Sequence, residues 1–165
     1  MLIKSSPSRF TGGIPVIWKG MDLNFLKKFI FNYPNLQLNS NQENLLYESA
    51  RSAILHSLEC LNIGINDQVI VSSFTCDAVT KAVINSGAKI IYVDINQDLT
   101  MNDKCVLGAI NKNTKAIILQ NTFGRLGLKV DTIKKIKKNN IFILEDNCLS
   151  VGSKFMGKYL GKYGD

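Results

Sequence analysis

Three short segments carry the side chains best suited to chemistry. Glu145 and Asp146 follow the apolar run 141–144, where a carboxylate is partly desolvated and is best kept charged by a cationic partner. Segment 72–76 brings serines, a threonine and a thiol to the start of an expected helix. Segment 49–52, Ser-Ala-Arg-Ser, opens another expected helix. Its amides, the helix dipole and the guanidinium together suit a phosphate group.

Several other chemistries lack the residues that they need. The only histidine is His56, and the cysteines (Cys60, Cys76, Cys105 and Cys148) form no C-x-x-C pair, so neither a structural zinc site nor a Ser-His-Asp triad is expected. We interpret His56 as a packing or surface residue. No G-x-G-x-x-G loop follows a strand and no Walker loop is present, which disfavours dinucleotide and NTP binding.

The elements that must position these side chains alternate along the chain. The expected strands are 68–73, 89–95, 115–122 and 141–146, and the expected helices are 50–61, 77–86, 101–110 and 130–138. Such alternation implies right-handed βαβ units, and therefore a three-layer α/β fold with a mostly parallel sheet flanked by helices. In sheets of this kind ligands bind at the carboxyl ends of the strands. The hydroxyl of Ser49 is expected to cap the first helix.

The ends of the chain differ from this array. Residues 1–43 hold prolines and glycines around one amphipathic stretch, 23–31, and we expect an N-terminal arm and packing helix there. The α/β part is expected to occupy 44–165, and to end in a turn-rich, mobile tail over 157–165.

Composition sets broad limits on location and partners. The 165 residues are 45% hydrophobic and 20% charged, with a net charge of +7, the balance of a soluble globular protein. We expect no membrane span and no secretory signal, and hence a cytoplasmic protein. The lysines between 129 and 138 are most simply the solvated face of a helix, so a nucleic-acid partner is not expected.

Six segments in order resemble the DegT/DnrJ/StrS-type nucleotide-sugar aminotransferases, which depend on pyridoxal 5'-phosphate (PLP). The segments are Ser-Ala-Arg-Ser-Ala-Ile, Gln-Val-Ile-Val-Ser-Ser-Phe-Thr-Cys, Ser-Gly-Ala-Lys-Ile-Ile-Tyr-Val-Asp-Ile, Thr-Lys-Ala-Ile-Ile-Leu-Gln-Asn-Thr-Phe-Gly, Ile-Leu-Glu-Asp-Asn-Cys and Gly-x-x-x-Gly-x-x-Gly-Asp. The resemblance covers 44–165. It implies part of the large domain of a fold-type-I PLP-dependent transferase, a homodimer, and glutamate and a nucleotide-linked keto-sugar as substrates in polysaccharide or sugar-nucleotide biosynthesis.

The resemblance also assigns cofactor-binding positions. Ala50 and Arg51 match the Gly-Thr step that holds the cofactor phosphate, so the amide contacts are kept while the hydroxyl contact is lost. Cys76 matches the residue that covers the pyridine ring. Asp146 matches the carboxylate that pairs with the protonated ring nitrogen. Leu149 stands where many relatives place a Gln or His near the ring hydroxyl.

One departure from the family concerns catalysis. The family's Schiff-base lysine follows the Gly-Asp motif, whereas Lys154, Lys158 and Lys162 precede it and the chain ends at Asp165. We therefore expect a truncated chain that is inactive by itself and has no catalytic residue of its own. Two alternatives stay open: a non-catalytic remnant or partner subunit, and an unrelated Rossmann-like binding domain with an acidic partner.

Overall fold

The computed structural model describes residue 45 and residues 47–165. The expected N-terminal arm and its amphipathic stretch lie outside the described residues. Within the described part, no helix is both long enough and apolar enough to cross a membrane.

Four parallel strands form the central sheet in the order β2-β1-β3-β4. They are β1 (Gln68–Ser72), β2 (Lys89–Val93), β3 (Thr114–Gln120) and β4 (Phe142–Asp146). The chain passes from β1 to β2 on one side, and then crosses back so that β3 pairs with the other side of β1. This reversal makes the carboxyl ends of β1 and β3 the switch point at which α/β sheets open a crevice for ligands.

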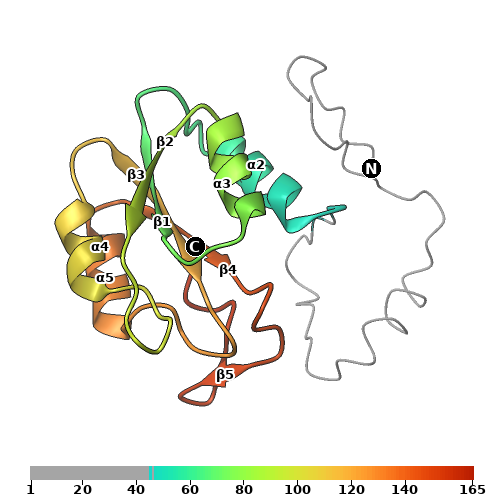
Figure 1. Cartoon of the computed structure of the whole chain (residues 1–165), viewed down its shortest axis with the longest axis vertical. Coiled ribbons are helices and arrows are strands. Elements are labelled where there is room, and N and C mark those ends of the chain that lie inside the picture. The colour runs from blue at the N-terminus through green and yellow to red at the C-terminus, as the bar shows by residue number, and fades with distance from the viewer. Residues whose placement is uncertain (1–44, 46) are drawn as a thin grey trace.

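Helices cover both faces of the sheet, which confirms the expected three layers (Figure 1). The helices α2 (Ala50–Cys60) and α3 (Asp77–Asn85) pack on one face, and α4 (Asp103–Ala109) and α5 (Val130–Lys138) pack on the other. Strand side chains alternate between the two cores because successive residues of a strand point to opposite faces. Val69 and Val71 join the core under α2 and α3, whereas Ile70 joins the core under α4 and α5.

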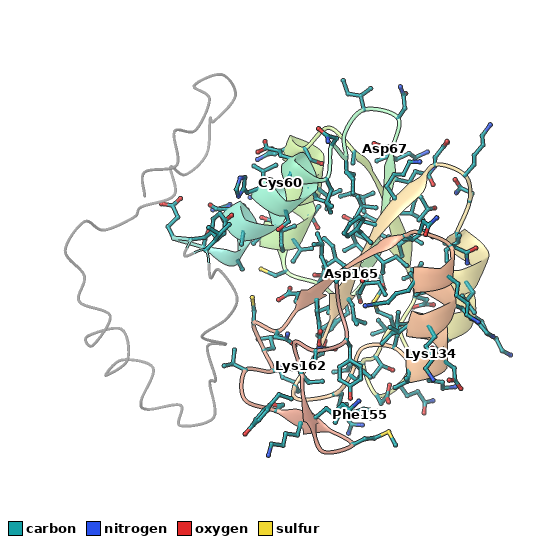
Figure 2. All side chains as sticks on the ribbon, turned by 180° about the vertical axis from the view of Figure 1, so that it is seen from behind. Cys60, Asp67, Lys134, Phe155, Lys162 and Asp165 are labelled. Carbon is teal, nitrogen blue, oxygen red and sulfur yellow. The ribbon has the colours of Figure 1, made fainter. Side chains whose placement is uncertain are left out.

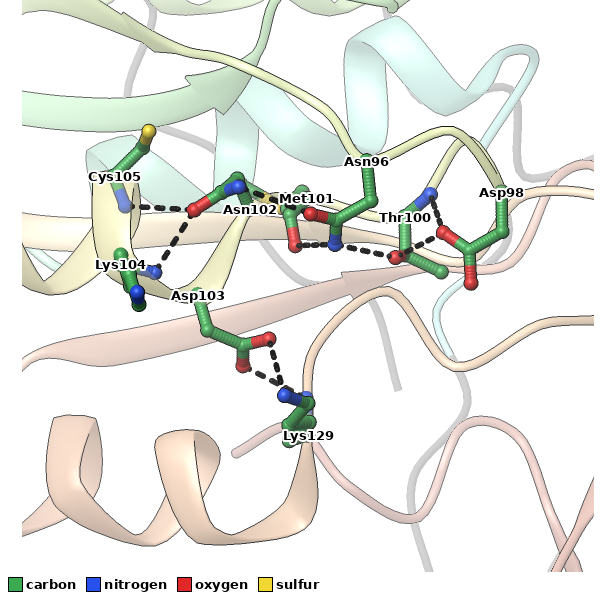
Figure 3. A network of polar contacts seen from close by, with 9 residues as sticks. All are labelled: Asn96, Asp98, Thr100, Met101, Asn102, Asp103, Lys104, Cys105 and Lys129. Carbon is green, nitrogen blue, oxygen red and sulfur yellow. Dashed lines mark hydrogen bonds and ion pairs between the residues drawn. The ribbon is translucent and has the colours of Figure 1, made fainter.

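Capping side chains set where two of the helices begin. Ser49 caps α2 as expected, since its Oγ accepts a hydrogen bond from the Ser52 amide at 3.2 Å. The helix expected over 101–110 is shorter in the structure and begins at Asp103. Its start is fixed because Asn102 Oδ1 accepts from the amides of Lys104 and Cys105 at 3.0 and 3.1 Å (Figure 3).

The C-terminal segment is more ordered than the expected mobile tail. Lys154–Phe155 (β5) and Lys158–Tyr159 (β6) form an antiparallel hairpin. The chain then returns to β4, where the Asp165 amide donates to the Ile143 carbonyl at 3.0 Å and Asp165 Oδ2 accepts from the Ile143 amide at 2.9 Å. Figure 2 shows Asp165 next to β4, with Phe155 in the hairpin and Lys162 on the segment that returns from it. The glycine-rich sequence alone does not predict this order, because the hydrogen bonds of the segment are made to residues far away in the chain.

Candidate functional site

A buried glutamine joins the two loops at the switch point between β1 and β3. Gln120 ends β3, and its Nε2 donates to the carbonyl of Phe74 and to Thr122 Oγ1, both at 3.0 Å. Its Oε1 accepts from Thr75 Oγ1 at 2.5 Å. Because Phe74 and Thr75 lead directly into α3, these bonds fix the loop that carries Cys76.

Asp146 lies at the carboxyl end of β4, as the sequence predicts. Its carbonyl accepts from the Asn121 amide at 2.9 Å, and its Oδ1 accepts from the Cys148 amide at 3.0 Å. The half-buried carboxylate is therefore held in place by the turn that follows it.

The pKa of the Cys148 thiol depends on its neighbours at the candidate site. Partial burial of this thiol, its hydrogen bond to Asp146 and the Asp146 charge raise its pKa to about 11. The charge of Cys76 makes a smaller contribution in the same direction. The structure thus groups Cys148 with Asp146 in the turn after β4.

Ala50 and Arg51 occupy the first turn of α2, where helix geometry gives backbone amides no acceptor within the helix. The other end of α2 lies at the amino edge of the sheet, since the chain enters β1 a few residues after Cys60. The 11 residues of α2, roughly 16 Å long, therefore extend toward the carboxyl edge. Both residues are exposed. Among the described residues, no hydrogen bond or ion pair joins either of them to Asp146 or Cys76.

Asn121, for which the sequence alone predicted no role, is fully buried beside Asp146. Its Nδ2 donates to Glu145 Oε1 and to Asn147 Oδ1, both at 2.7 Å, and its Oδ1 accepts from the Gly127 amide at 2.8 Å. One amide side chain therefore connects the loops after β3 and β4. A polar residue directly after a buried apolar strand is the sequence signal that could have singled it out.

Glu145 was noted only as the neighbour of Asp146, yet it organises the C-terminal segment. Its Oε1 accepts from the Gly161 amide at 2.7 Å, and its Oε2 accepts from the amides of Tyr163 and Gly164, both at 2.8 Å. A Cβ on Gly164 would lie 2.9 Å from the Glu145 Cβ, so only glycine fits this approach. Glu145 thus binds the returning chain, whereas the Asp146 carboxylate accepts from the loop at the carboxyl edge.

A helix N-terminus, a loop thiol after β1 and a carboxylate at the end of β4 follow one another along the chain, and this order agrees with a match to a family model. The model of the DegT/DnrJ/EryC1/StrS aminotransferase family matches residues 38–165. The chain belongs to this family. The parallel sheet with its two helical layers is part of the large domain of fold-type-I PLP-dependent aminotransferases.

Three relatives of this family member illustrate what it is similar to. GDP-perosamine synthase of Escherichia coli O157:H7 is 30% identical over 149 residues, which are 90% of this chain and 40% of that protein. UDP-N-acetyl-3-dehydro-alpha-D-glucosamine 3-aminotransferase of Acidithiobacillus ferrooxidans is 30% identical over 118 residues, 71% of this chain and 32% of that protein. The crystal structure of NtdA from Bacillus subtilis, with bound cofactor PMP, is 29% identical, with a TM-score of 0.59 over 66% of this chain and 25% of that one. The chain therefore spans less than half the length of each relative.

The family uses PLP, and the residues at the carboxyl edge fit this group. An aspartate matches a cationic ring nitrogen, and the amides and guanidinium in the first turn of α2 match a phosphate. The exposed thiol of Cys76 can lie against a ring but covers less of it than an aromatic side chain. Leu149 is 54% exposed and offers no hydrogen bond to a ring hydroxyl.

Proposed function

We propose that this chain is the N-terminal portion of a PLP-dependent aminotransferase that acts on a nucleotide-linked keto-sugar. Glutamate is the proposed amino donor, and sugar-nucleotide or polysaccharide biosynthesis is the proposed setting. The observation that carries this proposal is the position of Asp146, a fixed carboxylate at the carboxyl end of β4 beside the switch point. The names of two relatives, one a synthase of a GDP-sugar and one an aminotransferase of a dehydro-sugar linked to UDP, support the substrate class.

Each side chain has a defined part in this proposal. PLP, when bound, supplies the electron sink that lets an amino group move between two carbonyl compounds. Asp146 accepts a hydrogen bond from the protonated ring nitrogen and stabilises its positive charge. The first turn of α2, with Arg51, binds the phosphate. Cys76 excludes water from one face of the ring, and Gln120 holds the loop on which Cys76 lies.

Titration with PLP tests the cofactor site directly. We expect weak, non-covalent binding to the purified chain, detected by fluorescence, and Asp146→Ala to weaken it about tenfold or more, because the ring nitrogen then loses its ion pair. Asp131→Ala is the matched control, since Asp131 is an exposed aspartate on α5 that forms an ion pair with Lys134. Equal affinity of the wild type and Asp146→Ala would overturn the assignment of Asp146.

The same resemblance leads us to propose that residues 1–165 by themselves transfer no amino group. The family's cofactor-binding lysine follows the Gly-Asp motif, and Lys154 and Lys158 belong instead to the β5–β6 hairpin, where Lys154 Nζ lies 4.5 Å from the centre of the Tyr159 ring. Incubation with PLP, glutamate and a panel of nucleotide keto-sugars should give no amino-sugar above a control with PLP alone. Turnover that is lost when one of the hairpin lysines or Lys162 is changed would contradict this.

We propose that the chain forms a homodimer in the cytoplasm, that residues 1–43 pack as an arm, and that 44–165 is the partial large domain. The family match argues against an unrelated Rossmann-like domain. A non-catalytic partner subunit is the alternative to a piece of an active enzyme. It is favoured if the chain copurifies with a complete family member and binds no PLP.

A further inference from the structure

A cysteine, a histidine and a tyrosine form a chain of contacts along α2. His56 and Cys60 are one helical turn apart, and His56 Nε2 lies 3.4 Å from Cys60 Sγ. On its other side, His56 Nδ1 is hydrogen-bonded to the hydroxyl of Tyr47. The two rings are tilted by 54°, with their centres 5.5 Å apart. A thiol, a base and a group that orients the base are thus arranged in sequence.

The hydrogen-bond capacities of the three groups are compatible with proton transfer. With a proton on Nδ1, His56 donates to the Tyr47 oxygen, and Nε2 is then an acceptor for the Cys60 thiol proton. Burial, and then the charge of Cys60, raise the pKa of Tyr47, so the tyrosine stays protonated and neutral beside the pair. Figure 2 labels Cys60 on α2, where the residue is exposed.

The other cysteines differ from Cys60 in their surroundings. All four cysteines in the described part are exposed. The thiol of Cys148 faces a carboxylate, which opposes its ionisation, and Cys76 belongs to the candidate cofactor site. Cys105 lies in the first turn of α4, where its amide donates to Asn102 Oδ1. Among the described residues, no histidine is hydrogen-bonded to Cys105. Among these residues, Cys60 alone combines exposure with an imidazole nitrogen next to its sulfur.

We propose that Cys60 is a modification site, at which His56 activates the thiol for exchange with a low-molecular-weight disulfide. The thiol proton passes to His56 Nε2, and Sγ attacks one sulfur of the disulfide. A new bond forms between Sγ and that sulfur while the original S–S bond breaks. The leaving thiolate takes the proton from the imidazolium, so the products are a mixed disulfide on Cys60 and one free small thiol. Glu59, next to Cys60 in the chain, is the nearest acidic residue in sequence.

The test measures modification of each cysteine of the full chain by mass spectrometry, with oxidised glutathione and, separately, iodoacetamide at pH 7.5. We expect Cys60 to react at least about fivefold faster than Cys105 with both reagents, because the thiolate is the reactive form. His56→Phe should bring the rate of Cys60 to within about twofold of that of Cys105. Glu59→Gln is the matched control on the same helix and should not slow Cys60. Cys105 serves as the internal reference for folding, since its own rate should be the same in every variant.

Each outcome decides the proposal. Preferential modification of Cys60 that His56→Phe abolishes and Glu59→Gln preserves supports it. Equal rates for Cys60 and Cys105 in the wild type, or a fast Cys60 in His56→Phe, overturn it. Because Cys60 lies at the opposite end of α2 from Ala50, either result leaves the PLP titration unaffected.

Discussion

Asn121 Nδ2 donates a 2.7 Å hydrogen bond to Glu145 Oε1, and this contact joins the carboxyl ends of β3 and β4. The same oxygen accepts from the Gly161 amide, so Asn121 and the returning C-terminal segment share one carboxylate. The position of Asp146, next to Glu145 in the chain and bonded through its carbonyl to the Asn121 amide, therefore depends on this shared carboxylate.

Replacing Glu145 by Gln should loosen the C-terminal segment. The carboxylate accepts four N–H groups, whereas an amide places its own donors against two of them. We expect a loss of roughly 2 kcal/mol in local stability, and hence cleavage by trypsin after Lys162 about tenfold faster or more. Glu59→Gln is the control, and equal cleavage of the two variants would contradict the role of Glu145.

Two glycines should respond in opposite ways to alanine. A Cβ on Gly127 would lie 2.2 Å from the Gln120 carbonyl oxygen and 3.0 Å from Leu119 Cδ1, whereas a Cβ on Gly108, within α4, would meet nothing within 4 Å. In urea denaturation, Gly127→Ala should lower the free energy of unfolding by about 2–4 kcal/mol because the backbone must move. Gly108→Ala should raise it by about 0.5–1 kcal/mol. If Gly127→Ala leaves the free energy of unfolding unchanged, the backbone at Gln120 can move at little energetic cost, which contradicts the prediction.

The pH dependence of alkylation should identify the environment of Cys148. Its pKa is raised from 9.0 to about 11, mainly by burial and then by Asp146, so its alkylation should rise with pH toward half-maximum near pH 11. Asp146→Asn removes a negative charge and should shift this midpoint to lower pH. If the pH profile of Cys148 alkylation is unchanged in Asp146→Asn, Asp146 does not contribute to the raised pKa of Cys148.

The same raised pKa has a consequence for stability in alkali. The folded chain keeps the Cys148 proton at a pH where the unfolded chain has lost it. This contribution to stability is complete below pH 9.0 and is lost as the pH rises toward about 11. Thermal unfolding across this window should therefore show a smaller decrease for Cys148→Ser than for the wild type. Parallel curves for the two proteins would contradict the linkage.

Self-association should occur through the loops at the carboxyl edge. Phe74, Phe123, Leu149 and Val151 follow three neighbouring strands and are 44%, 65%, 54% and 47% exposed. Water contact with this much apolar surface favours association. Sedimentation at micromolar concentration should show dimers or larger species, and the double change Phe74→Ser with Phe123→Ser should shift them toward monomer. Ile65→Ser, at an 82% exposed residue before β1, is the control. A stable wild-type monomer would contradict the prediction.

Local patterns were enough to predict the sheet, its helices and the position of Asp146. Apolar runs and helical spacing depend on neighbouring residues, and the cap at Ser49 needs only the amide of Ser52. The ends of the elements were predicted less accurately. The helix expected from 101 starts at Asp103 because Asn102 caps it. The assignments of Ala50, Arg51 and Cys76 to a cofactor came from resemblance, and they stay predictions.

Contacts between distant segments could not be predicted in this way. Asn121 and Glu145 are 24 residues apart, and nothing in either local sequence specifies the other as its partner. The C-terminal tail was expected to be mobile for the same reason. In the structure, Glu145 on β4 accepts hydrogen bonds from three of its amides. His56 was interpreted as a packing or surface residue, and its contacts with Tyr47 and Cys60 were found only in the structure.

The bonds of Gln120 affect how any ligand at the switch point would bind. Because its side chain already holds Phe74, Thr75 and Thr122, the loop before α3 has a defined shape before a ligand arrives. Binding then loses little conformational entropy, since few backbone torsions remain to be restricted. In Gln120→Ala the same contacts to ligand would be available, but affinity would fall through a more unfavourable entropy, which calorimetry can distinguish from a loss of enthalpy.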